Sequence, residues 1–136
     1  MLTGRQSTDE MKNTSSFLLF TNNDARALPF GNRYFDFVIC KNVLHHMPNL
    51  ESVNRLVGET VRVGKRALIV EVMNPAYEGW FGRRRHWYYT KWLHDAGEFF
   101  LSREAFNAVT NLPERVDMFE MSTIRGVYQF ALFSAR

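Results

Sequence analysis

The chain has 136 residues, of which 46% are hydrophobic and 23% are charged, and its formal net charge is +3 at pH 7. This length and composition predict a single soluble domain with one core of ordinary size. Cys40 is the only cysteine, which excludes an internal disulfide, and we expect a reduced, buried thiol in a cytoplasmic protein. No apolar stretch approaches the roughly 20 residues of a membrane helix. The charge is small and dispersed, so it is a weak argument for a polyanionic partner such as nucleic acid.

The first predicted strand follows a polar N-terminal segment, residues 1–15. It covers 16–20 (SFLLF), an apolar run that stops at a turn of Thr, Asn and Asp residues. Further strands are predicted at 34–40 (YFDFVIC), where Asp36 interrupts the apolar run and fixes the strand entry, and at 66–73 (RALIVEVM). Such nearly continuous apolar runs are typical of strands covered on both faces, as in a parallel sheet.

An amphipathic helix is predicted between the strands at 34–40 and 66–73. From about residue 50, hydrophobic residues recur every three or four positions, at Val53, Leu56, Val57 and Val61. Gly64 occupies the C-terminal cap position of this helix. Strand, helix and strand with short connections form a right-handed crossover unit, so the fold class is α/β.

The second half of the chain begins with an irregular, aromatic segment at 74–101. Its three glycines and its spacing do not fit one helix, and we interpret it as a lid-like excursion. Ser102 then caps a short helix that Pro113 ends. Two final strands are predicted at 115–121 and 126–136, close enough in sequence to pair antiparallel.

Polar residues stand where the predicted strands end. In open α/β sheets, ligands bind beyond the carboxyl ends of the strands, which here are followed by residues 22–25, 41–46 and 71–74. Asp24 can accept hydrogen bonds from an adenine amine or a ribose hydroxyl. It can equally be a turn-forming residue, and the pattern leaves both interpretations open.

Four short motifs between residues 24 and 49 occur at a characteristic spacing. They are Asp24-Ala25, Leu28-Pro29-Phe30, Phe35-Asp36 and Leu44-His45-His46. This segment resembles the middle of a class I S-adenosylmethionine-dependent methyltransferase, of the subfamily acting on quinones, sterols and other small molecules, and the resemblance extends over residues 14–136. It implies a Rossmann-like sheet that lacks its first two strands and ends in an antiparallel strand pair, within one partial domain.

The resemblance implies S-adenosylmethionine as the cofactor. It places Asp24 and Ala25 at the adenine edge, and Lys41, Asn42 and His46 along the methionine side. A metal site from His45 and His46 alone is not expected, because consecutive side chains point in different directions.

Glu71 and His86 are the catalytic candidates. Glu71 would orient or deprotonate a substrate at the end of its strand, or be a solvated loop carboxylate. His86 is a candidate base within an aromatic lid, in which Trp87, Tyr88 and Tyr89 would contact the small-molecule acceptor. In the alternative interpretation, the same rings cover the open end of the sheet or pack against another copy of the chain in an oligomer.

The family's glycine-rich turn and the acidic residue that binds the ribose would lie upstream of residue 16, so we expect an incomplete cofactor site. The same absence exposes a sheet edge. We expect residues 16–20 to close against 34–40, or a second copy to cover the edge in a two-fold dimer.

Two functions other than catalysis stay open. One is an inactive remnant that acts as a dimerisation or interaction module. The other is binding of single-stranded nucleic acid or an anionic membrane surface by Arg83, Arg84 and Arg85, although three arginines are few for that purpose.

Overall fold

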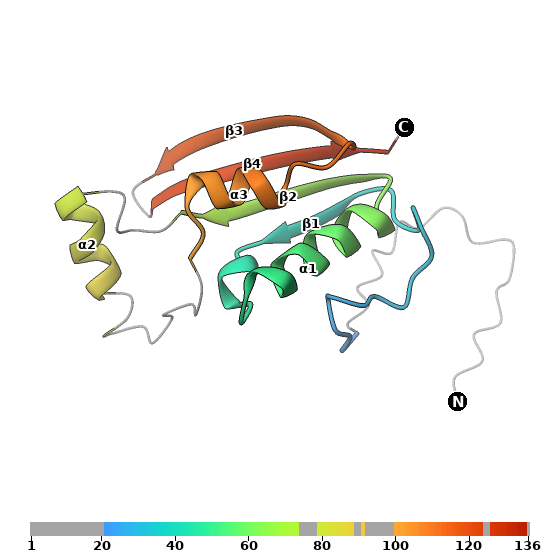
Figure 1. Cartoon of the computed structure of the whole chain (residues 1–136), viewed down its shortest axis with the longest axis horizontal. Helices are drawn as coiled ribbons and strands as arrows, with labels where there is room; N and C mark the ends of the chain where they lie inside the picture. The colour runs from blue at the N-terminus through green and yellow to red at the C-terminus, as the bar shows by residue number, and fades with distance from the viewer. Residues whose placement is uncertain (1–20, 74–78, 89–90, 92–99, 124–125, 136) are drawn as a thin grey trace, which may run out of the picture.

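The computed structural model describes residues 21–73, 79–88, 91, 100–123 and 126–135. Figure 1 shows how their helices and strands are arranged. In chain order the elements are β1 (Val38–Lys41), the 3-10 turn η1 (Leu44–His46), α1 (Leu50–Val63), β2 (Arg66–Val72), α2 (Gly79–Tyr88), α3 (Arg103–Val109), β3 (Arg115–Thr123) and β4 (Gly126–Ser134). The segments predicted at 1–15 and 16–20 lie outside the described residues.

One mixed sheet organises the fold, with the strand order β1-β2-β4-β3. β1 and β2 are parallel, and α1 connects them as the predicted crossover. β4 pairs antiparallel with both β2 and β3. The α/β class and the antiparallel C-terminal strand pair are therefore confirmed.

The core lies between the sheet and the two helices α1 and α3, which lie along the same face of the sheet (Figure 1). Leu56, Ile69, Phe106 and Phe133 each keep 1% or less of their surface exposed. Burying a side chain of this size contributes about 1.5–3 kcal/mol. This layer therefore fixes how the strand ends are placed relative to α1.

α1 begins and ends where the sequence predicts. The side chain of Asn49 accepts a hydrogen bond from the Ser52 amide at 2.9 Å and caps the N-terminus. Gly64 is the C-cap, but its φ of −97° is not left-handed. Glycine is needed there for close approach, because a Cβ would lie 2.7 Å from the carbonyl oxygen of Arg66 and 3.0 Å from Val38 Cγ2.

β1 is shorter and more exposed than predicted. Before it, Phe35 makes only an isolated bridge with Gly64, and Asp36 forms an ion pair with Lys65 at 2.6 Å. This contact supports the structural interpretation of Asp36. Ile39 is 61% exposed. The prediction that this strand is covered on both faces is therefore wrong for the part of the chain that the structure describes.

The segment at 74–101 is more regular than predicted, because α2 forms a ten-residue helix within it. The remaining residues of that segment, except 91, 100 and 101, lie outside the described part. The predicted start of α3 is confirmed, since Ser102 Oγ accepts from the Ala105 amide at 3.1 Å. The helix ends at Val109, with Thr110 as its C-cap, so Pro113 does not end it. Among the described residues, no helix has the length and apolar character required to cross a membrane.

Candidate functional site

The candidate site lies at the carboxyl ends of the parallel strands β1 and β2, where the turn η1 follows β1. The chain stays attached to β2 just past the end of β1, since the Asn42 amide donates to the Val70 carbonyl at 2.9 Å. Figure 1 shows α2 at the end of the molecule toward which β2 points. The two strand ends and η1 therefore form one polar edge of the sheet.

Asn42 combines a left-handed backbone with an unsatisfied side chain. Its φ is 54°, a region that asparagine tolerates better than most residues. Its Oδ1 atom is buried and has no hydrogen-bond partner within the described ranges. A buried acceptor without a donor is unfavourable by about 1–3 kcal/mol, so this atom is suited to receive a donor from a ligand.

Glu71 ties the end of β2 to η1. Its side chain is fully buried, and Oε2 accepts from the Leu44 amide at 2.8 Å. Oε1 accepts from the Val72 amide at 3.0 Å and from Nδ1 of His45 at 2.5 Å. The alternative of a solvated loop carboxylate is therefore wrong. A catalytic role for Glu71 stays a prediction, because three protein donors already use its oxygens.

His45 is the residue that sequence reasoning missed. It is 5% exposed, and its ring stacks on that of Phe100 with 5.2 Å between centroids and an interplanar angle of 3°. The resemblance pointed instead to His46, which is exposed, with its ring 4.1 Å from that of His45. A histidine and a glutamate at the ends of neighbouring parallel strands would have been the sequence signal for this pair.

A polar row continues from Glu71 across the helix-covered face of the sheet. Glu71 is opposite Gln129 in the register of β2 and β4, and Gln129 is opposite Glu120 on β3. Gln129 Nε2 donates to Glu120 Oε2 at 3.0 Å, and Arg103 donates to both oxygens of Glu120 at 2.6 and 3.0 Å. Arg103 and then Gln129 lower the pKa of Glu120. Gln129 Oε1 is a second buried acceptor that has no partner among the residues described.

Asp24 lies on the surface near the start of α1. Arg26 Nη2 donates to Asp24 Oδ2 at 2.8 Å, and these hydrogen bonds lower the pKa of Asp24 to about 2. Arg26 also reaches Ser52 Oγ, in the first turn of α1, at 3.4 Å. Ala25 packs against the core. Asp24 is therefore an ionised acceptor at neutral pH, held on the side of the molecule where α1 begins.

The other predicted site residues divide into those at the polar edge and those of α2. Lys41 is exposed at the end of β1, beside Asn42. Trp87 and Tyr88 belong to α2 and are 57% and 50% exposed. His86 also belongs to α2, but its side chain, like the whole of Tyr89, lies outside the described residues.

Neither a metal centre nor a reactive thiol is found in this region. In the ranges given above, no group of three or more His, Cys, Asp or Glu residues has the geometry of a metal site. Cys40 is free and buried, as predicted, and burial, followed by the charge of Glu71, raises its pKa to about 12. A neutral thiol of this kind is a core residue rather than a nucleophile.

Comparison with known proteins points to one kind of domain. Residues 3–68 match the sequence profile of the methyltransferase domain family. A search of curated proteins found no match.

Solved structures give the same indication. The chain is similar to a SAM-dependent methyltransferase from Methanosarcina mazei (16% identity, TM-score 0.54), covering 79% of this chain and 62% of that one. It is also similar to a SAM-dependent methyltransferase, a possible histamine N-methyltransferase, from Thermotoga maritima. The identity is 14% and the TM-score 0.58, and the match covers 82% of this chain and 61% of that one. A third similar structure is the N-methyltransferase NodS from Bradyrhizobium japonicum in complex with S-adenosyl-L-homocysteine. The identity is 11% and the TM-score 0.50, and the match covers 82% of this chain and 50% of that one.

The chain spans about half to three fifths of the length of these three structures. Identities at this level establish the fold and leave the substrate open. The fold is similar to that of these SAM-dependent methyltransferases, and residues 3–68 match the methyltransferase domain family.

Proposed function

We propose that this chain supplies part of an S-adenosylmethionine site and serves methyl transfer to a small-molecule acceptor. The observation that carries the proposal is the buried, unsatisfied Oδ1 of Asn42 at the carboxyl end of β1. Ligands of open α/β sheets bind at this end of the strands. The methyltransferase profile over residues 3–68 supports the same assignment.

The residues at this edge fit part of the cofactor. S-adenosylmethionine carries an ammonium, a carboxylate, a ribose diol and an adenine amine. Asn42 Oδ1 offers an acceptor to the ammonium, and the exposed ammonium of Lys41 offers a charge partner to the carboxylate. The ionised Asp24 offers acceptors to the ribose or adenine. The sequence contains no G-x-G turn, so the cofactor's other backbone contacts have to come from elsewhere.

When bound, the cofactor would supply a methyl group on its sulfonium; the acceptor would bond to that methyl in line as the carbon–sulfur bond breaks and S-adenosylhomocysteine leaves. The work of the protein is then to align the acceptor and to exclude water. Glu71 and His45 act here as positioning residues, because their contacts hold η1 against the end of β2. His86, Trp87, Tyr88 and Tyr89 stay proposed acceptor-side residues.

Calorimetric titration with S-adenosylhomocysteine, using two variants of Asn42, tests the proposal. Asn42→Gly keeps the left-handed backbone and removes the acceptor, whereas Asn42→Asp keeps an acceptor at the same position. A hydrogen bond to a charged group contributes about 1.5–3 kcal/mol, so Asn42→Gly should weaken binding roughly 10-fold to 100-fold. Asn42→Asp should bind at least as tightly as the wild type.

Equal affinities of the wild type and Asn42→Gly would contradict the assigned role of Asn42. No heat with any of the three proteins would contradict the cofactor site as a whole. Circular dichroism of each variant verifies that the fold is retained.

A second candidate function is an interaction module formed by two copies of the chain. The exposed, apolar β1 favours it, with Ile39 61% exposed at one edge of the sheet. The opposite edge strand, β3, carries Arg115, Asp117 and Glu120, and charges of this kind discourage pairing between edges. The two-fold dimer predicted from the sequence would therefore form through β1.

A further inference from the structure

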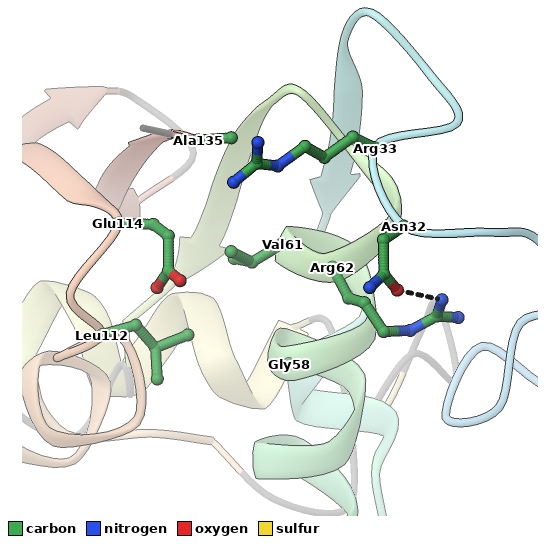
Figure 2. A pocket seen from close by; sticks show the side chains of 8 residues that line it. All are labelled: Asn32, Arg33, Gly58, Val61, Arg62, Leu112, Glu114 and Ala135. Carbon is green, nitrogen blue, oxygen red and sulfur yellow. Dashed lines mark hydrogen bonds between the residues drawn. The ribbon is translucent and has the colours of Figure 1, made fainter.

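A cavity lies at the opposite end of the strands from Asn42 and Glu71. Its volume is about 290 Å³. It is lined by Asn32, Arg33, Gly58, Val61, Arg62, Leu112, Glu114 and Ala135 (Figure 2). Arg33 is attached to the end of α1 through its amide, which donates to the Arg62 carbonyl at 2.8 Å. The Ala135 amide donates to the Lys65 carbonyl at 2.9 Å, next to the first residue of β2.

Two opposite charges face this cavity without partners. Figure 2 shows the guanidinium of Arg33 and the carboxylate of Glu114 projecting into it from different segments of the chain. Throughout the described part of the chain, neither side chain makes a hydrogen bond or an ion pair. Both are therefore available to a ligand.

The backbone holds both charges in place. Arg33 has a φ of 56°, a left-handed conformation that is unfavourable for a non-glycine residue by about 1–3 kcal/mol. Its side chain projects into the cavity (Figure 2). The carbonyl of Glu114 accepts from the Ser134 amide at 3.0 Å. Strain of this kind is common where a side chain is presented to a ligand.

The guanidinium of Arg62, the other cation in the cavity lining, already has hydrogen-bond partners within the protein. It donates to Glu59 at 2.6 and 2.8 Å, to the Phe30 and Leu28 carbonyls at 2.8 and 3.0 Å, and to Asn32 Oδ1 at 3.0 Å. It therefore builds the wall of the cavity. Arg33 is the cation left for an incoming anion.

The surface between the two charges is apolar and open. Val61 and Leu112 pack against the core on their inner side and line the cavity on the other. Gly58 adds free space, because a Cβ there would meet no atom within 4 Å. A volume of about 290 Å³ is at the lower limit of ligand sites, which span roughly 300–1,000 Å³, so the ligand has to be small.

We propose that this cavity binds a small zwitterion of the α-amino-acid class. The carboxylate of the ligand pairs with Arg33, its ammonium pairs with Glu114, and a short aliphatic side chain covers Val61 and Leu112. A ligand with a single charge would leave either Arg33 or Glu114 covered and unpaired, which is unfavourable. This site is separate from the proposed cofactor site and does not depend on it.

Three probes of similar shape test the charge requirement in calorimetric titrations of the full chain. L-leucine carries both charges, leucinamide only the ammonium, and 4-methylpentanoate only the carboxylate. We expect saturable binding of L-leucine and affinities about tenfold or more weaker for each singly charged probe. Equal affinities of the three probes, or no saturable binding of L-leucine at millimolar concentrations, would overturn the proposal.

Because S-adenosylmethionine also contains an amino-acid group, the proposed cofactor site can compete for L-leucine. Variants of the cavity lining distinguish binding at the two sites. Arg33→Gln and Glu114→Gln should each weaken L-leucine binding about tenfold or more, whereas Arg55→Gln, on an exposed position of α1, should not. Gly58→Phe fills the cavity and should abolish binding, and Gly58→Ala should retain it. Wild-type affinity in Arg33→Gln and Glu114→Gln would place the binding elsewhere and refute the site.

Discussion

The carboxylate of Glu71 joins the end of β2 to η1 in the polar edge. It has no exposed surface, and it satisfies the amides of Leu44 and Val72 and the ring of His45. Removing it leaves three donors in a buried region without an acceptor. Each such group is unfavourable by about 1–3 kcal/mol, and partial relaxation reduces the sum.

Glu71→Ala should therefore lower the free energy of unfolding by about 3 kcal/mol, measured by urea denaturation followed by circular dichroism. Glu51→Ala is the matched control, because the Glu51 side chain is 72% exposed and its loss should change stability by less than about 0.5 kcal/mol. A Glu71→Ala variant as stable as Glu51→Ala would show that the buried contacts do not hold η1.

The sequence predicts the polar edge itself but only part of its chemistry. The rule that ligand sites follow the carboxyl ends of strands correctly brings Asn42 and Glu71 together. It does not show that Glu71 is buried, because burial depends on how η1 folds back over β2. The pairing of His45, rather than His46, with Glu71 depends on the same turn.

At the element scale, β1 is the segment whose environment differs most from expectation. An apolar run predicts cover on both faces, yet the described residues leave Ile39 61% exposed. α1 is predicted well because its apolar residues recur regularly over 14 residues, and β2 because its apolar run is long. The four residues of β1 carry too little pattern to show what covers them. α2 is missed because its glycines and aromatics do not produce an apolar stripe.

The exposed side chain of Ile39 on the edge strand β1 predicts that two copies of the chain associate through this strand. Sedimentation velocity should show a dimer of the wild type at micromolar concentration, and Ile39→Lys should shift it to monomer, because two lysines would face each other across the two-fold axis. Val116→Lys is the matched control on the opposite edge strand, where Val116 is 59% exposed. A monomeric wild type, or equal dissociation by Val116→Lys, would contradict the dimer through β1.

At the scale of the whole molecule, the two candidate sites lie at opposite ends of the strands. The polar edge with Asn42 and Glu71 follows the ends of β1 and β2, and the cavity between Arg33 and Glu114 lies beside the start of β2. The α/β class, the crossover and the antiparallel strand pair could be predicted from the sequence, because each depends on local features: apolar runs, a helical period and short connections. The cavity could not, since its lining comes from four segments that only the folded sheet brings together.

Amide chemical shifts during titration with S-adenosylhomocysteine show whether the carboxyl edge of the sheet binds the cofactor. We predict saturable shifts that centre on Asn42, η1 and Glu71 rather than on the amides of Arg33 and Glu114. Shifts that centre on the cavity between Arg33 and Glu114, or no shifts at millimolar ligand, would contradict the assignment of the cofactor site.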